Sequence, residues 1–239
     1  CCHPESVEGS QFGKYPDNLT YRVGLNWGIQ FEFYLPRQEN MSSGTESAWK
    51  QLNELPHDEV CRNADTKFDP SADAYILTCF GQDVEVCPAK CAIQSNSPVL
   101  APMLGKLRYF SELSILRYLV GARDVPLSGN LIRPADMRGG QIYAGGSHVL
   151  PLDKLAQKYG GSAEDFLARG RELHAGNAGI GDASLRLMPF PRIPVVIVLW
   201  KACDEFAARA DLLLDSSCEL HLPQDIVWAT AMVSILMLM

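Results

Sequence analysis

Charged and aromatic residues gather around one apolar segment in the last third of the chain, "GDASLRLMPFPRIPVVIVLW" at 181–200. Arginine guanidinium groups bind carboxylates and phosphates, carboxylates accept hydrogen bonds or bind metal ions, and tryptophan offers a flat apolar face. A few polar groups that converge beside apolar surface are typical of a small-ligand site. We therefore expect a ligand-binding site formed by Asp182, Arg192, Trp200, Glu205, Asp215, Arg133 and Tyr143.

A structural interpretation of the same residues competes with the binding interpretation. Strands at 194–200 and 210–215 would pair as a hairpin, which places Asp215 at the end where Arg192 lies. A salt bridge between these two side chains would then hold the sheet together. Glu205 would fall at the hairpin turn.

An acid–base or metal-dependent enzyme is a further alternative, because carboxylates can work together with a histidine. The sequence holds no H-E-x-x-H, G-x-S-x-G or P-loop motif. The glycine-rich "GNAGIGD" at 176–182 leads toward a strand and not from a strand into a helix, so it is no dinucleotide fingerprint. The sequence favours a binding role over catalysis and identifies no cofactor or metal site. The residues that such an enzyme would use are Asp182, Asp204, Glu205 and Asp215 with His148, His174 or His221.

Three prolines within residues 189–194 shape the approach to the apolar run. Each proline fixes its own φ angle, removes an N–H donor and keeps the preceding residue extended. We therefore expect a rigid extended approach to a strand at 194–200, which is apolar on both faces and so central and buried. Asp182 and Arg192 would both lie at the entrance of this strand, and the polar side chains at its two ends would converge on one cavity.

Eight cysteines are present, without a C-x-x-C pair. Two strands joined at Gly81–Gln82 would carry Cys79 and Cys87 on opposite faces if the turn has two residues, and on one face if it has three. Only the second arrangement would let them share a metal with Cys91. Free thiols in this number suit a reducing cytoplasm.

Composition excludes several classes of protein. The 239 residues are 47% hydrophobic and 21% charged, with a net charge of −7, so no basic surface for nucleic acid is expected. No window reaches the roughly 18–20 apolar residues that span a membrane. The apolar run at 226–239 predicts a buried closing helix, and a truncated membrane anchor is the alternative.

Periodicity predicts the remaining elements. Apolar residues at every odd position of 21–35 indicate a half-buried strand or a bent hairpin, and a loop is expected at 37–47. Helical spacing at 109–121 ends at a glycine. Strands grouped in hairpins, with helices between them, predict an α+β fold with a mixed or mainly antiparallel sheet and a closing C-terminal helix. We expect residues 1–16 to form a disordered tail and residues 17–239 to form one domain.

The late segment "GDASLRLMPFPRIPVVIVLWKACDEF", followed by "LLLDSS", resembles the family catalogued as domain of unknown function 3786. The upstream "LSILRYLVGARDVPLSGNLIRP" and "KYGGSAEDFLARGRELHAG" resemble the helices and turn of the same family, so the resemblance covers roughly residues 46–230. It implies an uncharacterised cytoplasmic protein of anaerobic bacteria and archaea, whose relatives often carry an iron–sulfur segment ahead of this domain. This chain departs from the family pattern at Lys201, Cys203 and Leu214.

The residues and the resemblance together predict a cytoplasmic accessory protein that binds a small anionic ligand or a cofactor, linked to anaerobic corrinoid or iron–sulfur metabolism. The glycine- and proline-rich loop at 122–150 would cover a pocket lined by Trp200, Tyr118 and Tyr143. The alternative is an interaction module that docks on an iron–sulfur or corrinoid protein, with 21–35 offering an edge strand.

Overall fold

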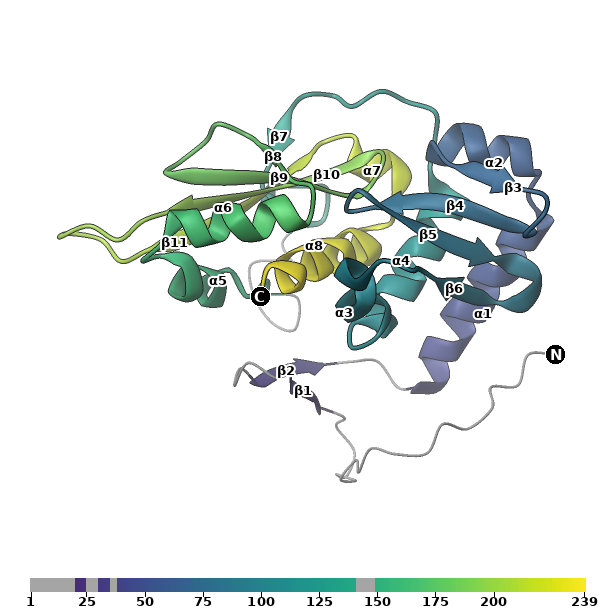
Figure 1. Ribbon diagram of the computed structural model, residues 1–239, viewed down its shortest axis with the longest axis horizontal. Coiled ribbons are helices and arrows are strands. Elements are labelled where there is room, and N and C mark those ends of the chain that lie inside the picture. Colours follow the sequence, from purple (N-terminus) through teal and green to yellow (C-terminus); the bar gives the residue numbers. More distant parts are fainter. Residues whose placement is uncertain (1–19, 25–29, 35–37, 141–148) are drawn as a thin grey trace.

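The computed structural model describes residues 20–24, 30–34, 38–140 and 149–239. It shows a five-stranded and a four-stranded antiparallel sheet with helices packed around them, and a separate two-stranded sheet (Figure 1). The α-helices are α1 (Gln38–Glu54), α2 (His57–Ala64), α3 (Ala101–Leu104), α4 (Arg108–Gly121), α5 (Leu152–Tyr159), α6 (Ala163–Glu172), α7 (Cys218–His221) and α8 (Gln224–Leu238). The strands are β1 (Thr20–Gly24), β2 (Gln30–Tyr34), β3 (Lys67–Asp69), β4 (Ala74–Cys79), β5 (Gln82–Cys87), β6 (Ala92–Gln94), β7 (Leu131–Ile132), β8 (Gly176–Asn177), β9 (Ala183–Phe190), β10 (Ile193–Trp200) and β11 (Arg209–Asp215).

The larger sheet has five strands in the order β7-β11-β10-β9-β8. Its central strand β10 pairs antiparallel with β9 on one side and with β11 on the other. Residues 193–199 are buried, because α8 and α5 contact this strand. The prediction of a central buried strand that pairs with the next strand along the chain is therefore confirmed.

The closing helix α8 forms the middle of the molecule (Figure 1). Every residue from Ile226 to Leu238 is buried, since α3, α4, α5, α6, β9 and β10 all contact this helix. A helix that is apolar all round is stable only where neighbours cover every side. The buried closing helix is thus confirmed, and none of the helices in the described residues combines the length and apolar character that a membrane crossing requires.

The smaller sheet has four strands in the order β3-β4-β5-β6. Strands β4 and β5 are joined by a two-residue turn in which Phe80 (φ 48°) and Gly81 (φ 73°) both have positive φ angles, as the twist of a tight hairpin requires. The N–H of Phe80 donates to the carbonyl of Met188 in β9 at 2.8 Å, which connects the two sheets at this turn.

The sequence placed that turn one residue too late, at Gly81–Gln82, and left its length open; the structure shows the two-residue alternative. Cys79 pairs with Gln82, and the register leaves Cys79 and Cys87 on opposite faces of the ribbon. The α+β class and the antiparallel pairing are confirmed. The alternation at 21–35 corresponds to the hairpin of β1 and β2.

The loop expected at 37–47 is wrong. Helix α1 already begins at Gln38, so its four turns include the polar residues that suggested a loop. Its second half buries Ala48, Trp49 and Leu52, and α1 packs against α4. Tertiary packing therefore outweighs the weak helix propensity of the serines and glycine in its first half.

Candidate functional site

The proline-rich segment before β10 is a second strand and a tight turn, and this changes where the predicted site residues lie. Strand β9 runs to Phe190, the chain reverses at Pro191–Arg192, and Phe190 pairs with Ile193. Asp182, which precedes β9, therefore lies beside the far end of β10, where its N–H donates to the carbonyl of Leu199 at 3.1 Å.

Asp182 and Arg192 are thus separated by the length of an eight-residue strand, about 23 Å at the usual rise per residue. The expectation that they flank one entrance and converge on one cavity is wrong. The residues divide into two groups, one at the turn end of β10 and one at its exit end.

At the turn end, the guanidinium group of Arg192 binds two separate segments of the chain, the end of α2 and the loop at 124–125. It donates to the carbonyl of Val125 at 3.1 Å, to the carbonyl of Arg62 at 3.1 Å and to the carboxylate of Asp124 at 2.7 Å. Only 17% of its side chain is exposed, and its Nε–H has no hydrogen-bond partner within the described residues. The ion pair shown for Arg192 is with Asp124, not with the expected Asp215.

The Tyr118 side chain supports the same turn from α4. Its hydroxyl group accepts the N–H of Arg192 at 3.2 Å and donates to the carbonyl of Ala64 at 2.9 Å. Its ring stacks on Phe190 with the centroids 4.6 Å apart. Burial raises the pKa of this hydroxyl, so it stays protonated and holds the turn.

Asp215 is also at the turn end, buried with 2% exposure, and backbone groups bind its carboxylate. It accepts the N–H and the hydroxyl of Ser128 at 3.0 and 2.7 Å, the N–H of Gly129 at 2.8 Å and the N–H of Ser217 at 2.9 Å. Burial by itself raises the pKa of this carboxyl, but the hydrogen bonds from Ser217 and Ser128 outweigh it and lower the pKa to about 2. Asp215 is therefore an ionised structural group.

At the exit end, the polar side chains are more exposed. The indole N–H of Trp200 donates to Asp211 at 2.7 Å, and the guanidinium group of Arg209 lies over the indole ring, 4.8 Å from its centroid. The Asp182 carboxylate accepts the N–H of Lys201 at 2.7 Å. Glu205 is exposed on the loop between β10 and β11, as expected for the turn of a hairpin.

The two remaining predicted residues join neither group. Arg133 is exposed and forms a two-point ion pair with Asp136, at 2.8 and 3.0 Å. Tyr143 lies outside the described residues. The expectation that Trp200 and Tyr118 line a common pocket is wrong, because they lie at opposite ends of β10.

Two of the three histidines considered for catalysis lie in the described residues. His174 contacts the Gln82 amide at 2.7 Å, and His221 accepts the backbone N–H of Arg123 on its Nδ1 at 3.3 Å. His148 lies outside them. Within the part of the chain that the structure describes, no three histidine, cysteine or acidic side chains form a group that could hold a metal ion.

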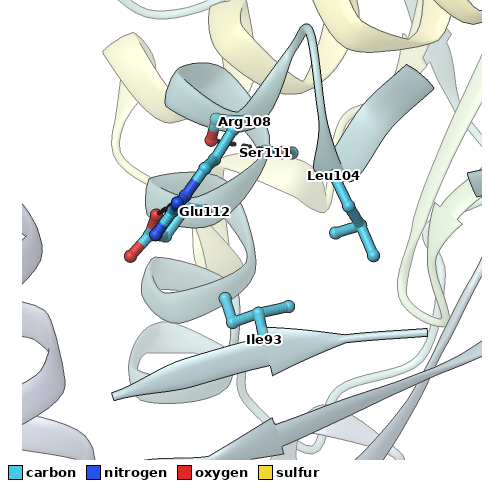
Figure 2. Close-up of a pocket in the computed structure, with 5 residues that line it drawn as sticks. All are labelled: Ile93, Leu104, Arg108, Ser111 and Glu112. Carbon is cyan, nitrogen blue, oxygen red and sulfur yellow. Dashed lines mark hydrogen bonds and ion pairs between the residues drawn. The ribbon is translucent and has the colours of Figure 1, made fainter. Parts of the chain in front are cut away.

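Among the hollows in the described part of the chain, two of very different size border the smaller sheet. Figure 2 shows the first, between β6 and α4, where Ile93 and Leu104 face Arg108, Ser111 and Glu112. Its volume of about 20 Å³ has room for about one water molecule. The second hollow has a volume of about 430 Å³ and lies over β4 and β5. Its lining residues are Ile76, Gln82, Asp83, Glu85, Ser95, Asn96 and Ser97.

The larger hollow uses residues that the sequence analysis did not select. Ile76 pairs with Glu85 and Thr78 with Asp83, so Ile76 and both carboxylates share one face of the sheet. The signal that could have found them is the acid–x–acid pattern on one face of β5, followed by the polar loop "SNS" at 95–97.

Comparison with known proteins assigns a family and nothing finer. No curated protein and no solved structure gives a significant match to this chain. The match to the family extends over residues 56–237 and so includes both ends of β10 and the larger hollow. The chain belongs to the family described as domain of unknown function (DUF3786), as its late segment indicated.

Proposed function

We propose that this protein is a binding domain that takes a small ligand, rich in hydrogen-bond donors, in the hollow over β4 and β5. The volume of this hollow, about 430 Å³, carries the proposal. Small-molecule sites commonly measure about 300–1,000 Å³. The cavity of Figure 2, at about 20 Å³, is too small for anything larger than water.

The chemistry of the lining selects the class of ligand. Two carboxylates, Asp83 and Glu85, share the hollow with hydroxyl and amide groups, and no lysine or arginine is among its lining residues. Such a wall favours amines and polyols, which donate hydrogen bonds to carboxylates, and disfavours anions. The anionic ligand suggested by the arginines therefore does not suit this hollow.

Both carboxylates keep an oxygen atom available for a ligand. The Oε2 atom of Glu85 accepts the Gln94 amide at 2.8 Å, and the Oδ1 atom of Asp83 accepts the Thr78 hydroxyl at 3.3 Å. Their second oxygens stand outside these bonds. Ile76, directly opposite Glu85 on the neighbouring strand, offers an apolar floor against which the carbon skeleton of a ligand can pack.

The test measures ligand binding to the whole chain by ligand-observed NMR and calorimetry. The probes are neutral sugars, polyamines, sugar phosphates and hydroxocobalamin, the last because the resemblance points to corrinoid metabolism. We expect a polyol or polyamine to bind, and Asp83→Asn with Glu85→Gln to weaken it about tenfold or more, since each lost charged hydrogen bond contributes about 1.5–3 kcal/mol.

A matched control removes two exposed carboxylates elsewhere, with Glu54→Gln in α1 and Asp153→Asn in α5. This variant is expected to bind as the native chain does. Failure of every probe to bind the native chain, or equal affinity in both double variants, would contradict the proposal.

The hairpin of β10 and β11 supports a second candidate, docking on a partner protein. Its loop projects from the body of the molecule (Figure 1), and Phe206 on this loop is 69% exposed. Aromatic side chains are enriched in the cores of protein–protein interfaces, so Phe206 offers an apolar anchor for a partner. A photo-crosslinking residue at position 206 is expected to capture one iron–sulfur or corrinoid protein, and the same residue at position 153 to capture none; equal capture at both positions would contradict docking.

A further inference from the structure

The segment between α4 and β7, residues 122–130, crosses the turn end of β10, and we refer to it as the strap. Side chains from three other elements hold it, and each uses a different kind of group. Its first anchor is a neutral imidazole, its second a guanidinium and its third a carboxylate. His221 accepts the N–H of Arg123, and Arg192 donates to the carboxylate of Asp124 and the carbonyl of Val125. Asp215 accepts the N–H groups of Ser128 and Gly129.

The first anchor works only while His221 is neutral. Its Nδ1 atom accepts the N–H of Arg123, so the ring proton is on Nε2. Protonation would add the second ring proton at Nδ1. The new Nδ1–H would then face the N–H of Arg123, and the hydrogen bond would be lost. The ring is 2% exposed, and its Nε2–H has no hydrogen-bond partner within the described residues, so a charged ring would gain no bond in return.

The charged groups around His221 favour its neutral form. Arg192 approaches it from the β9–β10 turn, Arg123 from the strap and Asp215 from the end of β11. Burial has the largest effect and lowers the pKa of His221, the two arginines lower it further, and Asp215 acts in the opposite direction.

Close packing holds the backbone of His221 against the end of α4. A Cβ atom at Gly121 would lie 2.8 Å from the carbonyl oxygen of His221, so only glycine lets the end of α4 approach α7 this closely. The ring is buried and the N–H that would oppose a protonated Nδ1 belongs to the strap, so movement of the strap is the direct response to protonation.

We propose that the strap is a proton-sensitive latch, in which protonation of His221 releases Arg123 and opens residues 122–125 while Asp215 continues to hold residues 128–129. Opening also removes Asp124 and Val125 from Arg192. The turn end of β10 then presents Arg192 and the charged His221 together, as a cationic surface that is closed at neutral pH.

The two titrating anchors act in separate pH windows. Because the folded pKa of His221 is below its unfolded value of about 6.5, its stabilising contribution is complete above that pH and is lost as the pH falls toward the folded value. Asp215, with a pKa of about 2, remains ionised throughout this range.

The test is hydrogen exchange of the whole chain, followed by mass spectrometry at pH 7.5 and pH 5.0 and corrected for the intrinsic pH dependence of exchange. We expect the protection of residues 122–125 to fall about tenfold or more at pH 5.0, and the protection of residues 128–129 to stay unchanged. His221→Asn keeps an acceptor for Arg123 but does not titrate, so this variant is expected to lose the pH response.

Unchanged protection of residues 122–125 at both pH values, or the same response in His221→Asn, would overturn the latch. If His221→Asn does not fold, an NMR titration of the native chain decides instead. The amide resonance of Arg123 must then shift with the same midpoint as the His221 ring, and a shift without that common midpoint would also overturn the latch.

Discussion

The two ends of β10 carry the same residue types in opposite circumstances. At the turn end, Asp215 and Arg192 are mostly buried and bind backbone groups of remote segments. At the exit end, Asp211 and Arg209 are 44% and 64% exposed and contact mainly the neighbouring Trp200. We therefore expect a charged side chain in this fold to be structural where it satisfies backbone groups from elsewhere in the chain, and to contribute little to stability where it contacts only its neighbours.

The largest effect on the free energy of unfolding is expected for Asp215→Asn, which removes the buried carboxylate at the turn end of β10. The amide keeps one acceptor oxygen, but its NH₂ group must face an N–H donor of Ser128 or Gly129. Lowering the pKa from 3.8 to about 2 is equivalent to about 2 kcal/mol in favour of the ionised carboxylate. With a mispaired donor added, we expect the free energy of unfolding at pH 7 to fall by about 2–3 kcal/mol in urea denaturation.

The pH profile of the native chain provides the control for this value. The stabilisation by Asp215 is complete above its unfolded pKa of about 3.8 and is lost as the pH falls toward about 2. Asp215→Asn should therefore lack this portion of the acid-induced loss of stability. If Asp215→Asn were as stable as the native chain at pH 7, the conclusion that Asp215 stabilises the fold would be wrong.

A smaller effect is expected for Arg192→Lys, which keeps the charge and removes the planar fork. An ammonium group on a flexible stem cannot reach the carbonyls of Arg62 and Val125 and the carboxylate of Asp124 at once. We expect a loss of about 1–2 kcal/mol in the free energy of unfolding, measured in the same urea series. Full stability of this variant would show that charge alone, without the three-way hydrogen bonding, holds these segments.

The sequence predicted what depends on local pattern and missed what depends on distant partners. The buried strand β10 and the buried helix α8 follow from the length and continuity of their apolar runs. The reversal at Pro191–Arg192 was missed, because prolines on both sides indicated an extended segment. That one turn moved Asp182 to the other end of the strand and divided the expected site.

The sequence did not predict the polar contacts at the turn end of β10 for a different reason. Asp215 binds Ser128 across 87 positions, and Arg192 binds Arg62 across 130 positions. No local pattern encodes such a pairing, since any exposed loop carries similar serines and glycines. The hollow over β4 and β5 is an intermediate case, because its carboxylates share a face only once the register of the hairpin is known.

The smallest effect is expected for Asp211→Asn, the matched counterpart of Asp215→Asn, four positions earlier on the same strand. Asp211 is 44% exposed, and an amide oxygen can still accept the Trp200 indole N–H. We expect the free energy of unfolding to change by less than about 0.5 kcal/mol, as for most surface substitutions. If Asp211→Asn lowered the free energy of unfolding about as much as Asp215→Asn, exposure would not explain the difference between the two ends of β10. The contact between Trp200 and Asp211 would then stabilise the fold as much as the buried contacts of Asp215. A small loss, set against the large one at Asp215, would show that the exit end of β10 tolerates substitution without cost to the fold, which leaves its residues available for contact with other molecules.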